Sequence, residues 1–179
     1  AYRADGPMVI NVATYEGRGW CYEENCISNL AKDSHLVLDL GRFSGTKTGF
    51  WDVTKECKAG REPPRSPPVF GEFMRTGVAS DEVQFTVKED AGLVSRLYQD
   101  GFVKTVNRVA AKEGYMGIDC KELGWGDDQG AVLVEALRYA AEHCAFPHGA
   151  VRVVVYGNRF TKDEAAWKEL EGKFVYCNY

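Results

Sequence analysis

The chain has 179 residues, of which 45% are hydrophobic and 27% charged, a composition typical of a single soluble globular domain. Its formal net charge of −4, from 22 basic and 26 acidic residues, provides no basic field for a phosphate backbone, which disfavours nucleic-acid binding. No apolar run approaches the roughly 20 residues that a membrane-spanning helix needs, so we expect no membrane span. Residues 1–179 are therefore expected to form one domain.

Six cysteines are spread along the chain without a CxxC motif or a Cys/His cluster. Their even number and wide spacing favour three disulfides over a metal site. Disulfides form in oxidising compartments, so the pattern predicts a secreted, extracellular protein, whereas a cytosolic protein would keep six buried thiols. A chain that begins at Ala1 fits a mature form whose leader has been removed, or a shortened chain. The expected disulfide residues are Cys21, Cys26, Cys57, Cys120, Cys144 and Cys177.

The N-terminal half predicts short strands, because apolar and polar residues alternate over several short stretches. These stretches are 8–13, 36–40, 50–53 and 83–87, with a shorter one over 69–73. Short polar links join the first three, which is typical of an antiparallel meander. We therefore expect a sheet built mainly from this half of the chain.

Two segments of the same half predict loops. Residues 58–68 hold four of the six prolines, and proline removes a backbone donor and interrupts helices and central strands. That segment is therefore expected to be an exposed loop within the single domain. Cys21 and Cys26 enclose a second loop, which carries the paired acids Glu23 and Glu24.

The C-terminal half predicts helices, with apolar residues at helical spacing after Asp90 and again after Asp127. A β-branched run over 151–156 predicts a buried strand, followed by a third helix over 161–171 and a final strand over 173–178. Strand, helix and strand in this order form a βαβ unit, whose two strands run parallel. The whole chain thus predicts an α+β fold: a mixed, mainly antiparallel sheet covered by two to three helices, with a C-terminal βαβ unit and stabilising disulfides.

Motifs for cofactors and metals are lacking, so we expect neither. There is no GxxxxGK[ST] phosphate loop, no GxGxxG after a strand and no GxSxG nucleophile elbow. His143 and His148 lie five residues apart, which does not place two metal ligands on one helical face. The acids Asp127 and Asp128 are better explained as helix caps than as calcium ligands.

Aromatic residues beside glycine, cysteine or acidic turn residues suggest a contact surface, because tryptophan and tyrosine often anchor binding partners. Trp20, Tyr22 and Trp125 are the candidates, while Trp51 and Trp167 are interpreted as core residues on a strand and a helix. The first hypothesis is therefore a secreted binding protein, such as an effector, a toxin-like virulence factor or an inhibitor. Its partner would be an extracellular protein or glycan.

The second hypothesis is a small secreted hydrolase of the nuclease or glycosidase type. It would use His35 or His148 with a carboxylate from Glu23, Glu24 or Asp39. A histidine and a carboxylate that face one cleft within hydrogen-bond reach would favour this hypothesis. A third possibility, a surface antigen or structural module, predicts a convex surface without a pocket.

Overall fold

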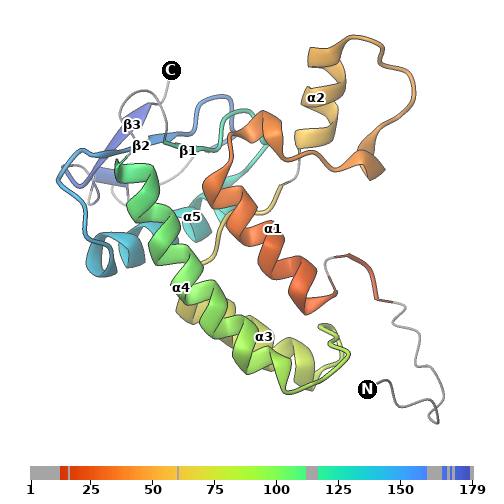
Figure 1. The fold of residues 1–179 in the computed structure, drawn as a ribbon. Coiled ribbons are helices and arrows are strands. Elements are labelled where there is room, and N and C mark those ends of the chain that lie inside the picture. The colour runs from red at the N-terminus through yellow and green to blue at the C-terminus, as the bar shows by residue number, and fades with distance from the viewer. Residues whose placement is uncertain are drawn as a thin grey trace.

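The structure is a computed structural model that describes residues 13–15, 17–59, 61–111, 117–160, 167–168, 170 and 172–177. Over these residues it is mainly helical, with a small parallel sheet (Figure 1). The helices are α1 (Gly19–Ala31), α2 (Phe50–Lys58), α3 (Pro67–Ala79), α4 (Asp90–Ala111) and α5 (Asp127–His143), with short 3-10 helices η1 (Ser34–Leu36) and η2 (Leu40–Arg42). The strands are β1 (Ile118–Asp119), β2 (Val151–Val154) and β3 (Phe174–Cys177).

The sheet has the order β1-β2-β3, and both pairings are parallel. Val151 pairs with Phe174 and Ile118 pairs with Val153. The predicted parallel pairing of the last two strands is confirmed, although residues 161–166 of the helix expected between them lie outside the described residues. A mainly antiparallel sheet is contradicted, because the described strands all run in one direction.

The strands expected in the N-terminal half are wrong where the structure describes them. Residues 50–53 begin α2, residues 69–73 lie inside α3, and residues 36–40 form turns and parts of η1 and η2. The stretch 83–87 contributes only an isolated parallel bridge between Gln84 and Arg18. The reason is that a run of four or five apolar residues fits a buried turn of helix as well as a strand. Of the stretch 8–13, residues 8–12 lie outside the described part.

Helix α3 shows why a helix forms at one of these stretches. Pro67 occupies the first turn, where its missing N–H costs nothing, and Ser66 precedes it. Phe70, Met74 and Gly77 then fall at intervals of three and four residues and share the buried face. The apolar run thus packs with helical rather than strand periodicity.

The proline-rich segment 58–68 runs through the interior instead of forming an exposed loop. Its carbonyl groups accept hydrogen bonds from three side chains of the core: Asn29 donates to Glu62, Tyr98 donates to Arg65, and Trp125 donates to Arg61. Proline suits this role because an extended segment without many N–H donors has fewer polar groups to satisfy when it is buried. Pro63, Pro64 and Pro67 are buried, whereas Pro68 is exposed.

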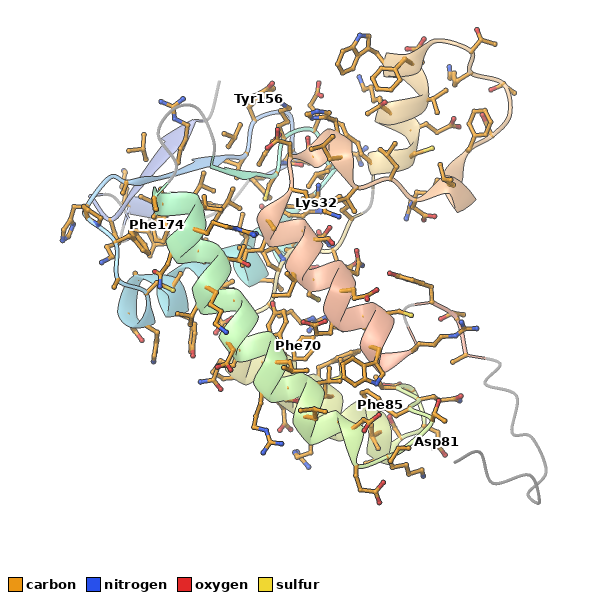
Figure 2. All side chains as sticks on the ribbon, viewed as in Figure 1. Lys32, Phe70, Asp81, Phe85, Tyr156 and Phe174 are labelled. Atoms are coloured by element: carbon orange, nitrogen blue, oxygen red, sulfur yellow. The ribbon has the colours of Figure 1, made fainter. Side chains whose placement is uncertain are left out.

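The core lies between α1, α3 and α4 and continues under the sheet, where α5 packs. Phe70 occupies the space between the helices in Figure 2, and its ring stacks on Tyr98 with centroids 3.8 Å apart. Tyr22 stacks on the same Phe70 ring at 5.8 Å. Helices α4 and α5 confirm the two helices predicted after Asp90 and Asp127, because long apolar periodicity is the most reliable sequence pattern. No described helix has the length and apolarity required to cross a membrane.

The predicted disulfides are wrong, because the cysteines whose side chains are described carry free thiols. Four of these thiols are buried at separate places in the core, where cysteine serves as a small apolar residue. The expectation of secretion rested on the disulfides and therefore loses its physical basis. The side chain of Cys177 lies outside the described part. The free cysteines are Cys21, Cys26, Cys57, Cys120 and Cys144.

Alkylation provides a test of the thiol assignment. When the protein is unfolded in denaturant without a reductant, we expect iodoacetamide to modify all five of these cysteines. In the folded protein we expect Cys21 to react first, because it is only partly buried, whereas Cys57 and Cys120 are fully buried. Peptide mass spectrometry reads out both reactions. If modification of the unfolded chain required prior reduction, the free-thiol assignment would be contradicted.

Burial also makes the stability depend on alkaline pH. Burial raises the pKa of the Cys26 and Cys120 thiols from 9.0 to about 12. Between about pH 9 and about pH 12 the two thiols therefore stay protonated in the folded protein and lose their protons in the unfolded chain. The free energy of unfolding is expected to fall above pH 9 by about 1.4 kcal/mol per pH unit for each thiol. Urea unfolding of Cys120→Ala between about pH 8 and about pH 10 should give a shallower decline than the parent, and an equal decline would contradict this origin.

Candidate functional site

The carboxyl end of β1 is where polar side chains from several segments meet. Strand β1 ends at Asp119, and the turn that follows lies beside η1 and α2. The carboxyl edge of a parallel sheet is a common place for ligand sites, because the loops that follow its strands converge there.

Asn158 ties the loop after β1 to the loop after β2. Its Oδ1 accepts hydrogen bonds from the backbone N–H groups of Leu123 and Trp125 at 3.0 and 3.1 Å. Its Nδ2 donates to the carbonyls of Cys120 and Val155 at 2.7 and 2.8 Å. These four bonds saturate the side-chain amide and fix the loop that carries part of the site.

A histidine and two carboxylates lie together at this edge. Asp33, His35 and Asp119 each offer one ligand atom, and the three atoms lie within 4.8 Å of one another. Asp119 is held in place from both sides: Oδ2 accepts from the backbone N and the hydroxyl of Ser34 at 3.2 and 3.4 Å, and Oδ1 accepts from the backbone N of Lys121 at 3.1 Å. The arrangement places an imidazole beside a fixed, buried carboxylate.

His35 lines a cavity of about 330 Å³, which we call the His35 pocket. Helix α2 forms one side of the pocket and the turn after β1 forms the other. Three lysines face it, together with two acids, a threonine and the ring of Trp51. The lining residues are His35, Trp51, Asp52, Thr54, Lys55, Lys58, Lys121 and Glu122.

Lys58 is the most firmly placed cation of the His35 pocket, with only 4% of its surface exposed. Its Nζ donates to Glu122 Oε2 at 2.9 Å and to the carbonyl of Lys121 at 3.3 Å. The hydrogen bond from Lys58 lowers the pKa of Glu122, which keeps that carboxylate charged. An ammonium has three donors, so these two bonds leave one N–H for a ligand.

The backbone of Glu122 adopts an uncommon conformation. Its φ is 52°, in the left-handed region that non-glycine residues rarely occupy. The hydrogen bond from its N–H to the carbonyl of Tyr156 at 2.9 Å holds it there. Gly157 is required opposite, because a Cβ at that position would lie 2.7 Å from Glu122 Cγ. Such strain costs about 1–3 kcal/mol and concentrates at functional sites, which supports a role for this turn.

The donor set of Asp33, His35 and Asp119 is of the type that binds divalent cations. However, the Nζ of Lys121 lies 3.3 Å from Asp119 Oδ2 and neutralises the buried carboxylate. Burial alone would lower the pKa of Lys121, but the charge of Asp119 and the hydrogen bond to it raise that pKa above its usual value. The buried guanidinium of Arg61 donates to the Asp33 carbonyl at 3.4 Å. These neighbouring cations oppose a metal ion through Coulomb repulsion.

Of the two histidines proposed as catalytic, His35 lies beside carboxylates, whereas among the described residues no carboxylate is paired with His148. The carboxylates are Asp33 and Asp119, rather than the expected Glu23, Glu24 or Asp39. The exposed His148 places its Nδ1 3.0 Å from the carbonyl of Gly172.

The three acids expected as partners lie elsewhere. Asp39 accepts a hydrogen bond from the backbone of Gly41 and pairs with Arg42 at 3.3 Å. Glu23 and Glu24 lie on α1, which replaces the loop expected between Cys21 and Cys26.

The aromatic residues are distributed differently from the sequence interpretation. Tyr22 and Trp125 are buried in the core and cannot form a contact surface in this fold. Trp20 is half-exposed, and its Nε1 donates to Asp90 at 3.2 Å. Trp51, interpreted as core, is 71% exposed, and Trp167 is partly buried against the ring of Phe160.

Sequence reasoning missed Asp33, Lys58, Asp119, Lys121 and Glu122. Their only local pattern is the Asp-Ser-His triplet at residues 33–35, which is too short to indicate chemistry. The contact that assembles the site joins Ser34 to Asp119, 85 residues further along the chain. Only the tertiary fold reveals it.

Comparisons with protein-family models, with curated proteins and with solved structures found no match to this chain. The function therefore has to be argued from the geometry of the site.

Proposed function

We propose that the protein is a hydrolase of small phosphate esters, with His35 as the general base. The observation that carries the proposal is the position of His35 beside Asp33 and Asp119, at a pocket lined by lysines. The cavity of about 330 Å³ is within the size range of sites that hold small molecules.

The roles follow from the chemistry of the side chains. A carboxylate near an imidazole can orient the ring, and Asp119 offers an oxygen within 4.8 Å of a His35 ring nitrogen. The remaining N–H of Lys58 and the ammonium of Lys55 provide donors for phosphate oxygens. Positively charged donors that are fixed before the reaction stabilise the charge that develops in the transition state.

The reaction is a transfer of the phosphoryl group to water. His35 removes a proton from water, the water oxygen forms a bond to phosphorus, and the bond from phosphorus to the leaving oxygen breaks. In an in-line displacement the leaving oxygen is on the opposite side of phosphorus from the attacking water, so it takes a proton from solvent, and the protonated His35 releases its proton to solvent. No redox partner is required, and the products are an alcohol and inorganic phosphate.

A small substrate is favoured over a polynucleotide. The net charge of −4 gives no extended basic surface along which a nucleic acid would bind. Lys55, Lys58 and Lys121 gather at this one cavity. The exposed ring of Trp51 in its lining provides a face for an aromatic leaving group.

A screen of chromogenic aryl phosphates, sugar phosphates and nucleoside monophosphates tests the proposal. We expect the purified protein to hydrolyse at least one of these classes, His148→Gln to match it, and His35→Gln to lose the activity. Addition of EDTA should leave the rate unchanged, because the proposal assigns no metal. Failure to release phosphate from any class, or equal rates for the parent and His35→Gln, would exclude this function.

A further inference from the structure

A second hollow lies between α1 and residues 36–42, and its lining residues differ from those of the His35 pocket. Two adjoining cavities of about 600 and 580 Å³ share Tyr15, Asn25, Val37 and Leu38 among their lining residues. Because the lining is shared, we treat the two cavities as one groove and call it the α1 groove.

The lip of the α1 groove is unusually apolar for a surface. Leu36 and Leu40 line it and are 58% and 73% exposed. Phe43, Phe50 and Trp51 are exposed in the same part of the chain, which extends away from the helical core in Figure 1. A group of large exposed apolar residues in one segment indicates a surface that a partner covers.

The charged residues of the α1 groove indicate the chemistry of that partner. Glu23, Glu24 and Glu62 line it, and no lysine or arginine of the described chain forms an ion pair with any of them. Burial, and then the charge of Glu24, raises the pKa of Glu23, as expected for a partly buried carboxylate beside a second one.

Two of the cations in the lining of the α1 groove are already engaged. Arg42 is paired with Asp39 at 3.3 Å. Arg61 is buried and donates to the carbonyls of Asn29 and Asp33 at 2.9 and 3.4 Å. Lys32 is the remaining basic residue in the lining, and among the described residues none forms an ion pair with Glu23, Glu24 or Glu62. Counted together, the four acids of the lining (Glu23, Glu24, Asp39 and Glu62) exceed its three cations (Lys32, Arg42 and Arg61) by one negative charge.

We propose that the α1 groove binds a segment of a partner protein that carries both basic and large apolar side chains. Leu36 and Leu40 would receive the apolar side chains, while Glu23, Glu24 and Glu62 would pair with lysine or arginine. The acidic lining repels nucleic acid and anionic lipid, which leaves a protein segment as the occupant. This surface replaces the one expected at Trp20, Tyr22 and Trp125, and it does not depend on the hydrolase activity.

Synthetic fluorescent peptides provide the probe, with binding measured by fluorescence anisotropy. We expect a lysine/leucine peptide to bind more tightly than a lysine/serine peptide or a glutamate/leucine peptide. Leu36→Ser combined with Leu40→Ser is expected to weaken this binding about tenfold or more, as is Glu23→Gln combined with Glu24→Gln. The glutamate variant should also reduce the dependence of the affinity on salt.

Matched control variants distinguish binding in the α1 groove from nonspecific binding to other exposed apolar or acidic residues. Leu93 and Leu97 on α4 are 41% and 43% exposed, and serine at both should leave the affinity unchanged. Glu82→Gln combined with Glu89→Gln controls in the same way for the loss of two exposed acids. The proposal is overturned if the groove and control variants bind alike, if the three peptides bind alike, or if the groove variants lose binding to anionic lipid vesicles instead.

Discussion

Replacing Trp125 by alanine is expected to lower the free energy of unfolding by about 3–5 kcal/mol. The indole is 2% exposed, and its Nε1 donates to the carbonyl of Arg61 in the buried segment between α2 and α3. Alanine would leave a cavity that the surrounding residues fill only partly, together with a buried carbonyl that lacks a donor. Urea unfolding followed by far-ultraviolet circular dichroism measures the change without relying on tryptophan fluorescence.

Two further variants separate the contributions at this position. Trp125→Phe keeps most of the apolar volume and removes the N–H donor, so we expect a loss of about 1–2 kcal/mol. Trp51→Ala removes an equally large side chain that is 71% exposed, and its effect should stay within about 0.5 kcal/mol. Similar losses for Trp125→Ala and Trp51→Ala would contradict the placement of Trp125 in the core.

Replacing His35 by glutamine is expected to lower kcat by about 100- to 10,000-fold on any phosphate ester that the protein hydrolyses. Glutamine keeps hydrogen-bonding capacity at this position but cannot transfer a proton at neutral pH. KM should change little, because the lysines that would hold the phosphate group remain. Steady-state kinetics on the best substrate from the screen measures both constants.

The unfolding midpoint of His35→Gln should match that of the parent, since His35 is only partly buried and loses no packing. His148→Gln changes an exposed histidine outside the His35 pocket and should retain the full kcat. If kcat fell equally in both variants, or if His35→Gln changed KM alone, His35 would have a role other than proton transfer.

Prediction succeeded where the pattern was long and failed where it was short. The apolar faces of α4 and α5 extend over several turns, so helical periodicity is distinguishable from alternation, and the β-branched residues of β2 predict a buried strand. In contrast, Leu36, Leu38 and Leu40 alternate as a strand would, yet Leu36 and Leu40 belong to the short 3-10 helices η1 and η2, and no strand in the described part of the chain pairs with this stretch. A pattern of four or five residues is too short to distinguish a strand from a turn or a short helix.

The predictions of disulfides and of an aromatic contact surface were wrong for a related reason. An even number of cysteines is compatible with disulfides or with separately buried thiols, and only the distances between them decide. Trp125 lies between two glycines, as in a turn, but the turn directs the indole inward to the carbonyl of Arg61. The direction of a side chain from a loop is set by tertiary contacts that local sequence does not encode.

The candidate site was predictable only in part. The sequence offers His35, along with His148, as an acid–base residue. The chemistry of proton transfer requires such a residue to face a carboxylate in one cleft. The partner Asp119 is the last residue of a two-residue strand, and Lys58 ends a short helix where the sequence predicts a strand and a loop. Both join His35 only through the packing of η1 and α2 against the carboxyl edge of the sheet.

The most direct test is a titration with inorganic phosphate, the expected product, followed by NMR of the histidine ring signals. If the His35 pocket binds phosphate groups, the signals of His35 will shift and reach saturation, while those of His143 and His148 stay in place. Lys58→Met should abolish the saturable shift, because it removes the donor that Glu122 positions. An unchanged His35 signal, or equal shifts of all three histidines, would contradict a phosphate site in this pocket.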